Sequence, residues 1–122
     1  MSSIIINAVS QYIPELSNNE GLNFCYLYEV SIENKSNHSI ELLTRHWDIY
    51  DALGNQKQVD GDGVIGQHPV ISPGEIFKYK SYCLLETEFG CMSGFYTFKN
   101  ENGKVLKVSI PQFPLVLEKI IN

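Results

Sequence analysis

The sequence lacks the features that mark exported and membrane-spanning proteins. Its N-terminal stretch, MSSIIINAVSQYIPE, holds no basic n-region and no small-residue cleavage site, so it does not read as a signal peptide. No run approaches the roughly 18 consecutive apolar residues that a membrane helix requires. We therefore expect a cytoplasmic protein with no membrane association.

Positive charge is also scarce. There are 9 Lys and Arg residues against 14 Asp and Glu residues, and the net charge is -5. This balance repels a phosphate backbone and argues against general binding to nucleic acid or anionic membranes. Lys78 and Lys80 share one predicted strand face, and the remaining lysines form no compact patch. We interpret these lysines as solvated strand surface.

Cysteine is sparse, and its spacing is not that of a disulfide framework. The 3 cysteines, Cys25, Cys83 and Cys91, are an odd number without paired spacing. In a chain without an export signal, this pattern favours reduced thiols. Cys25 and Cys83 fall inside predicted strands, where a buried and inert thiol is commoner than a nucleophile.

Helical periodicity is nearly absent, whereas alternation of apolar and polar residues is frequent. One predicted strand, for example, places Phe24, Tyr26, Tyr28, Val30 and Ile32 on a single face. Short segments with turn-forming residues, such as 18–21 and 72–74, separate the strands. The longer predicted strands are 24–33, 40–50, 75–84, 91–99 and 105–110, and the shorter ones are 4–12, 56–59 and 113–117.

This pattern predicts an all-β sandwich or small barrel that forms a single domain over residues 1–122. Asn102-Gly103 predicts a type I′ hairpin turn, because both central positions of that turn need a positive φ. The predicted strand at 40–50 places Leu43, Arg45 and Trp47 on one face. Trp47 is the only tryptophan, and we expect it to anchor the core.

The segment Asp60–Gly66 contains G-x-G-x-x-G, the spacing of a dinucleotide-binding turn. A dinucleotide site needs a helix directly after the glycines, but Pro69 and Pro73 would interrupt one. No Walker A lysine follows either. We interpret the glycines as the means of bending a tight loop, which the prolines stiffen and which remains able to present a binding surface.

Other residue patterns that could carry chemistry are incomplete. Asp60 and Asp62 suggest a calcium loop, but position 64 is Val and the position of the closing glutamate is Ile71. Glu86 and Glu88 share one strand face, and we interpret them as a solvated strand end. The histidines His38, His46 and His68 lack metal-ligand spacing, although a folded sheet could bring His46 or His68 near a carboxylate.

Several blocks of the sequence together resemble the ApaG family. The resemblance extends from about Val9 to Leu117, with the spacing between the blocks kept. The Gly-rich block followed by Pro-x-x-x-Pro-Gly is its most specific part. The blocks are Arg45–Ile49, Gly61–Gly74, Glu86–Thr87, Cys91–Tyr96 and Ile110–Phe113.

The resemblance implies a two-sheet antiparallel sandwich of the immunoglobulin-like or fibronectin type III-like kind. Members of this family are small bacterial proteins, and a similar domain is appended to some eukaryotic F-box and polymerase-associated proteins, which suggests protein–protein interaction. The family name is linked with cobalt and magnesium efflux and with genetic proximity to a diadenosine tetraphosphate hydrolase. Neither link identifies a biochemical activity.

A functional surface of the family would map onto the Gly-rich block of this chain. Asp62 stands where relatives often carry Glu, so the acidic character is kept. The residues that we expect to form a binding surface are Gly61, Asp62, Gly63, Gly66, His68, Pro69, Pro73 and Gly74.

The leading hypothesis is a non-enzymatic binding module that contacts an unknown protein partner through the stiff loop from Asp60 to Gly74 and neighbouring strand faces. We expect neither a cofactor nor a metal site. The alternative is a sensor for a phosphate compound or a divalent metal, with contacts from Asp60, Asp62 and His68. A hydrolase is a further, weaker alternative. A homodimer through an exposed sheet edge is a further expectation.

Overall fold

The structure is a computed structural model that describes residues 3–18 and 23–117. The predicted loop at 18–21 lies for the most part outside these described residues. No helix in the described part of the chain is long and apolar enough to cross a membrane. The elements are β1 (Ile4–Tyr12), the 3-10 helix η1 (Pro14–Leu16), β2 (Phe24–Asn34), β3 (Ile40–Asp51), β4 (Gln56–Asp62), β5 (Val70–Ile71), β6 (Ile76–Leu85), β7 (Gly90–Asn100) and β8 (Val105–Leu115).

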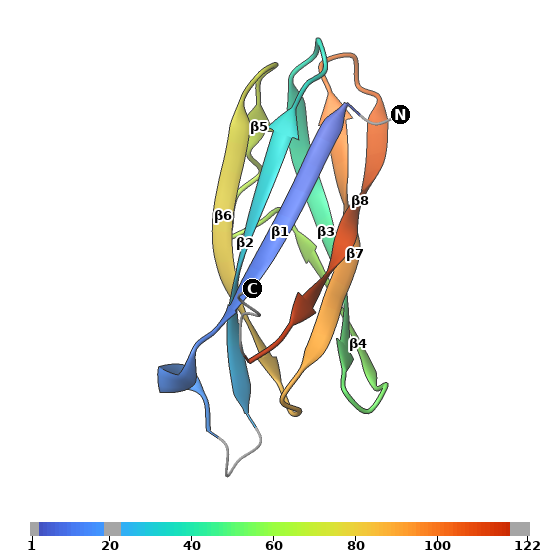
Figure 1. The fold of residues 1–122 in the computed structure, drawn as a ribbon. Coiled ribbons are helices and arrows are strands. Elements are labelled where there is room, and N and C mark those ends of the chain that lie inside the picture. Colours follow the sequence, from blue (N-terminus) through green and yellow to red (C-terminus); the bar gives the residue numbers. More distant parts are fainter. Residues whose placement is uncertain (1–2, 19–22, 118–122) are drawn as a thin grey trace.

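The strands form two antiparallel sheets that pack face to face (Figure 1). One sheet has the order β1-β2-β6, and the other has the order β4-β3-β7-β8, with β5 also paired to β3. The orders β1-β2-β6 and β3-β7-β8 are those of strands A-B-E and C-F-G in the immunoglobulin fold. The predicted two-sheet, immunoglobulin-like sandwich is therefore confirmed.

The core lies between the sheets and is rich in aromatic residues. Trp47 is 2% exposed and packs edge-on against Tyr28, with ring centroids 5.4 Å apart. The ring of Phe113 in β8 also packs edge-on against the Trp47 indole, with ring centroids 5.9 Å apart. Edge-to-face contacts of this kind add to the free energy gained by burying the rings. The prediction that Trp47 anchors the core is confirmed.

A β-bulge at Leu43 changes which residues of β3 face the core. Leu42 pairs with Phe98 and Thr44 pairs with Thr97, so β3 holds one residue more than β7 across this step. Since side chains alternate along a strand, the extra residue reverses the parity of the buried positions. Leu42 is buried before the bulge and Trp47 after it. The unbroken alternation predicted for 40–50, with Leu43 on the face of Trp47, missed this step.

A second bulge joins two predicted strands into one. Met92 pairs with Phe113 and Gly94 pairs with Ile110, so β8 has an extra residue near Pro111. The segments 105–110 and 113–117 were predicted as separate strands, but β8 runs unbroken from Val105 to Leu115. A proline is tolerated here because β8 is an edge strand and the bulge removes the need for one ladder hydrogen bond.

The hairpin between β7 and β8 is not the type I′ turn predicted from Asn102-Gly103. Gly103 has a φ of 82°, but Asn102 is not among the residues with positive φ. Asn100 donates its N–H to the carbonyl of Lys104, which closes a loop over 101–103. The Asn100 Oδ1 atom accepts the N–H groups of Asn102 and Lys104 at 2.9 and 3.0 Å. These bonds favour the longer loop with a glycine bulge.

Candidate functional site

The segment Asp60–Gly74 is not the single exposed loop that the sequence suggested. β4 continues to Asp62, so Gly61 and Asp62 belong to a strand. Val70 and Ile71 form β5, which pairs with β3 as β4 does. Only 63–69 and the turn after Ile71 lack strand structure, and they follow β4 and β5, which both pair with β3 on the side away from β7. No helix follows the glycines in the described chain, as Pro69 and Pro73 predicted.

A tight turn at Val64–Gln67 forms the outermost part of the motif. Val64 and Gln67 exchange two backbone hydrogen bonds, each of 2.9 Å. The two central residues, Ile65 and Gly66, both have positive φ values of 43° and 74°. Val64 is fully buried, whereas Ile65 is 57% exposed. A β-branched residue in the left-handed region is strained, so the turn holds Ile65 outward in a conformation that isoleucine disfavours.

The glycines of the motif allow close packing against Arg45. Arg45 Nη1 donates to the carbonyl oxygens of Asp62 and Gly63, at 3.2 and 2.8 Å. A Cβ atom on Gly61 would lie 2.2 Å from Arg45 Cζ, so the guanidinium group fits only over a glycine. At Gly63, which has a φ of 63°, a Cβ atom would lie 2.0 Å from the carbonyl oxygen of Gln67. Arg45 therefore fixes the start of the turn.

Pro73 and Gly74 belong to a different turn, between β5 and β6. The N–H of Glu75 donates to the carbonyl of Ser72 at 3.0 Å, and Gly74 has a φ of 83°. With Pro73 at the second position and a positive φ at the third, this is a type II turn. The Glu75 carboxylate also accepts the N–H of Ser72 at 2.7 Å.

Asn34 ties that turn to the end of β2. Its side chain is fully buried, and Nδ2 donates to the carbonyls of His38 and Ile71 at 2.8 and 2.9 Å. Its Oδ1 atom accepts the N–H of Ser36, and its backbone carbonyl accepts the N–H of Gly74. A fully satisfied buried amide rigidifies its surroundings. The structural role of this turn therefore accounts for the presence of Pro73 and Gly74. The two residues are not part of the Val64–Gln67 turn.

The residues predicted to contact a sensor ligand form two separate pairs. His68 Nε2 lies 3.1 Å from Asp62 Oδ2, and His46 Nδ1 lies 2.6 Å from Asp60 Oδ1. Both histidines therefore do meet carboxylates in the folded sheet. Among residues 3–18 and 23–117, no three His, Cys, Asp or Glu side chains are grouped so that they could hold a metal ion. The sensor hypothesis stays a prediction.

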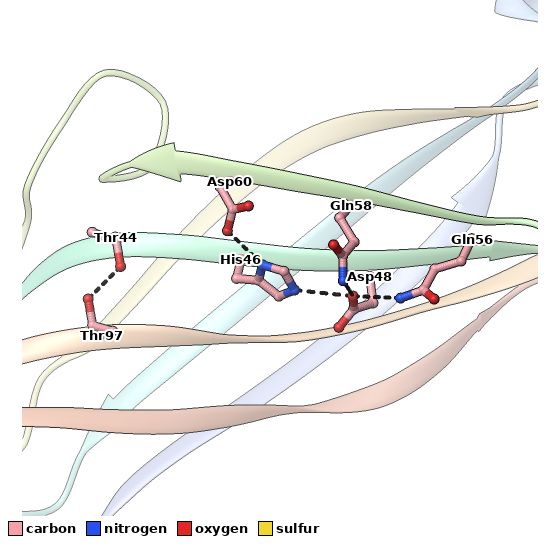
Figure 2. A network of polar contacts seen from close by, with 7 residues as sticks. All are labelled: Thr44, His46, Asp48, Gln56, Gln58, Asp60 and Thr97. Atoms are coloured by element: carbon pink, nitrogen blue, oxygen red, sulfur yellow. Dashed lines mark hydrogen bonds and ion pairs between the residues drawn. The ribbon is translucent and has the colours of Figure 1, made fainter.

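The second of these pairs belongs to a larger polar network on the outer face of the five-stranded sheet (Figure 2). His46 binds Asp60 through Nδ1 and Asp48 through Nε2, the latter at 3.1 Å. The same oxygen of Asp48 accepts the Nε2 groups of Gln56 and Gln58, both at 3.0 Å. The two glutamine bonds to Asp48 and the contact between His46 and Asp60 join β3 to β4.

Sequence reasoning did not identify this network. A signal for it was present, since Thr44, His46 and Asp48 alternate along β3 and Gln56, Gln58 and Asp60 alternate along β4. What the sequence did not contain was the register, in which His46 faces Asp60 and Asp48 faces Gln58.

The network favours a charged histidine between charged carboxylates. The hydrogen bond to Asp60 raises the pKa of His46, and the contact with Asp48 acts in the same direction. The hydrogen bond from Gln58, together with those from His46 and Gln56, lowers the pKa of Asp48. With both ring nitrogens bound to carboxylates, His46 is best satisfied as an imidazolium that donates two hydrogen bonds.

Neighbouring strands complete the face around His46. Its ring stacks on Phe95 of β7, with centroids 4.8 Å apart and an interplanar angle of 19°. Lys107 of β8 places its Nζ 4.0 Å from the centroid of the Phe95 ring, in reach of a cation–π attraction. A shallow hollow of about 440 Å³ lies beside these rings. It is lined by Thr44, Arg45, His46, Asp60, Gly61, Asp62 and Phe95.

Comparison with known proteins identifies the family of this chain. The family model of the ApaG domain matches residues 14–100. The chain belongs to the ApaG family. The ApaG protein of Beijerinckia indica is 40% identical over 112 residues, which cover 92% of this chain and 86% of that protein. The ApaG protein of Proteus mirabilis is 36% identical over 121 residues, covering 99% of this chain and 97% of that protein.

A solved structure gives the same result in three dimensions. The crystal structure described as that of an ApaA protein from Bordetella pertussis superposes with a TM-score of 0.92 and 35% sequence identity. The superposition covers 96% of this chain and 95% of that chain. The resemblance stated from the sequence blocks is therefore confirmed, and the ApaG-family sandwich accounts for nearly the whole chain.

Proposed function

We propose that this ApaG-family chain is a non-enzymatic binding module that contacts a protein partner in the cytoplasm. The contact would be made by the Val64–Gln67 turn and the neighbouring outer face of β4 and β3. The observation that carries the proposal is the conformation of Ile65, a β-branched apolar residue that is 57% exposed and held at a φ of 43°. Strain of this kind clusters at binding and switch regions.

The surroundings of Ile65 suit a preorganised contact. Val64 is buried directly before it, and Arg45 fixes the strand end through the carbonyls of Asp62 and Gly63. Because the turn is already rigid, a partner would order little additional chain when it binds. An apolar side chain presented in this way can enter a pocket of a partner as an anchor.

The chemistry of the polar and thiol groups supports a role without catalysis. Both nitrogens of His46 are bound to carboxylates, so its ring is poorly placed to remove a proton from a substrate. Burial raises the pKa of Cys25, and it raises that of Cys83 to about 11, so neither forms a ready thiolate. The 3 cysteines are unpaired, which fits a reducing compartment.

Capture of partners by tagged protein tests the proposal with a substitution that does not weaken the fold. Ile65→Asn removes the apolar side chain, and asparagine accepts the left-handed region more readily than isoleucine. The matched control is Leu53→Asn, since Leu53 is 79% exposed in the turn between β3 and β4. Proteins recovered from a bacterial cytoplasmic extract would be quantified by mass spectrometry for each variant.

We expect the wild-type chain and Leu53→Asn to recover the same partner in equal amounts. Ile65→Asn should recover roughly tenfold less, as expected for loss of an anchor residue. Its melting temperature should be no lower than that of the wild-type chain. Equal recovery by all three forms would show that the turn is not the contact, and recovery of nothing beyond the untagged control would refute the binding role.

A further inference from the structure

β6 forms one edge of the three-stranded sheet. It pairs with β2 along one side, from Ile76 to Leu85, and with no described strand along its other side. In Figure 1 it follows the left margin of the molecule. An edge strand presents a row of backbone donors and acceptors on which another strand can assemble.

The other edges are blocked in ways that β6 is not. β8 contains Pro111 and Pro114 and a bulge at 111–112. β1 is held against β8, where Ser10 Oγ donates to the carbonyl of Pro114 at 2.7 Å. β4 has 7 residues, one of them Gly61, whereas the 10 residues of β6 include neither proline nor glycine. Proline, bulges and short length are the usual protections of an edge strand.

The outward face of β6 has its charges separated along the strand. Ile76, which is 54% exposed, begins this face, and Lys78 and Lys80 follow it. Tyr82 and Leu84 follow and are 59% and 60% exposed. β6 ends at Leu85, and the exposed residues Glu86 and Glu88 lie in the bend that follows it. The exposed pair Tyr82 and Leu84 therefore lies between two lysines of the strand and two glutamates of the bend.

Two copies of this face are complementary in charge when the strands run antiparallel. If two copies of β6 run antiparallel about Cys83, the strand residues 81–85 of the two copies face each other, and Lys80 comes next to Glu86 in the bend of the second copy. In the same register, Tyr82 lies opposite Leu84, and Lys78 extends toward Glu88 in the same bend. Opposite charges and aromatic–aliphatic pairs directly across an antiparallel ladder are stabilising, and like charges there are destabilising.

We propose that two copies of this chain associate through antiparallel pairing of their β6 strands, centred on Cys83. The pairing extends the three-stranded sheet of each copy into one continuous sheet. The lysines that would otherwise protect the edge are neutralised by glutamates of the second copy. This interface uses other residues than the turn at Val64–Gln67, so the two proposals fail or succeed separately.

Sedimentation equilibrium on the full chain tests both the interface and its register. Glu86→Lys places lysine next to Lys80, and Lys80→Glu places glutamate next to Glu86, so each variant alone has like charges at both symmetric contacts. In a mixture of the two variants, both contacts again join opposite charges. The variants change net charge in opposite directions, so each controls for the other's effect on overall repulsion.

The wild-type chain should sediment as a dimer in equilibrium with monomer. Each variant alone should raise the dissociation constant roughly tenfold or more, since two pairs are disrupted. The equimolar mixture should recover the wild-type affinity. A wild-type chain that stays monomeric at every concentration, or a mixture that associates no better than its components, would overturn the proposal.

A second pair of variants guards against local effects on folding. Lys80 lies 3.9 Å from Glu29 of its own chain, so Lys80→Glu introduces a repulsion inside the monomer. Lys78→Glu and Glu88→Lys test the adjacent contact of the same register, and Lys78 takes part in no ion pair within the described residues. The mixture of these two variants should again associate better than either alone.

Discussion

The outer faces of the two sheets differ in how their polar groups are satisfied. On the five-stranded sheet, His46, Asp48 and Asp60 bind one another and the glutamines of β4 (Figure 2). On β6, the apolar pair Tyr82 and Leu84 is left exposed between lysines and glutamates. The first face closes its interactions within the chain and stabilises the fold. The face of β6 leaves apolar side chains and charges without partners of this kind, so they are available for contact with another molecule.

The largest loss of stability is expected from a substitution at Gly94, where two strands of the five-stranded sheet approach most closely. In Gly94→Ala, the new Cβ atom would lie 1.9 Å from the carbonyl oxygen of His46, which is backbone and has little room to move. We expect the free energy of unfolding to fall by about 3 kcal/mol or more, as for other overpacked sites. Urea denaturation measures it.

The matched control for this overpacking is Gly61→Ala. Its Cβ atom would meet the flexible end of Arg45, so the guanidinium group can move aside. The loss of the two Arg45 hydrogen bonds should cost about 1–2 kcal/mol. A Gly61→Ala variant that is less stable than Gly94→Ala would contradict the account of where the sheet is rigid.

The polar network should contribute the next largest effect. Asp48→Ala removes the acceptor shared by His46, Gln56 and Gln58, and we expect a loss of about 1–3 kcal/mol in thermal or urea unfolding. Leu84→Ser on the open face should change the unfolding free energy of the monomer by only about 0.5 kcal/mol, because Leu84 is 60% exposed. If the Leu84 variant were the less stable of the two, the comparison of the faces would be wrong.

The charge of His46 gives the network a dependence on pH. Its pKa is raised in the folded state, so its contribution to stability is complete below the unfolded pKa of about 6.5 and is lost as the pH rises through the folded pKa. The stability difference between the wild-type chain and His46→Gln should therefore shrink as the pH rises above neutrality. This stability difference should be about 1 kcal/mol or less at every pH, since water screens the attraction between His46 and the exposed Asp60.

Asp48 acts in the opposite direction at low pH. Its pKa is lowered in the folded state, so its contribution is present above the unfolded pKa of about 3.9 and is lost as the pH falls through the folded value. Melting temperatures measured from acid to mildly alkaline pH separate the two groups. A difference between wild type and His46→Gln that grows with rising pH would contradict the assignment of an imidazolium.

One substitution should have an effect of the opposite sign. Ile65→Asn relieves a β-branched residue of a left-handed backbone conformation, and we expect it to stabilise the fold by about 1 kcal/mol. Calorimetry on the purified variant measures the gain. A clear loss of stability would mean that the exposed isoleucine has packing contacts that outweigh its strain.

Much of the fold could be predicted from the sequence because it depends on local patterns. The alternation in 24–33 and the single Trp47 identified core strands correctly, and the prolines after Gly66 excluded a nucleotide-binding helix. Both bulges were missed, since each depends on pairing with another strand. The type I′ turn was wrong because Asn100 supplies two side-chain hydrogen bonds that favour a longer loop.

The candidate site was less accessible to sequence reasoning. Gly61 and Gly63 were identified as special, but their close packing against Arg45 and Gln67 required three-dimensional contacts. His46 was recognised only as a histidine that a sheet could bring to a carboxylate. Its partners Asp48 and Asp60 follow from the register of β3 and β4, which no local pattern encodes.

Amide hydrogen exchange at two protein concentrations tests most directly the contrast between the closed sheet and the open edge. We predict that the β6 amides pointing away from β2 exchange quickly in dilute protein and become protected at high concentration. The amides of β3 and β7 should be protected equally at both concentrations. Protection of β6 that does not change with concentration, or a change confined to β8, would contradict the account.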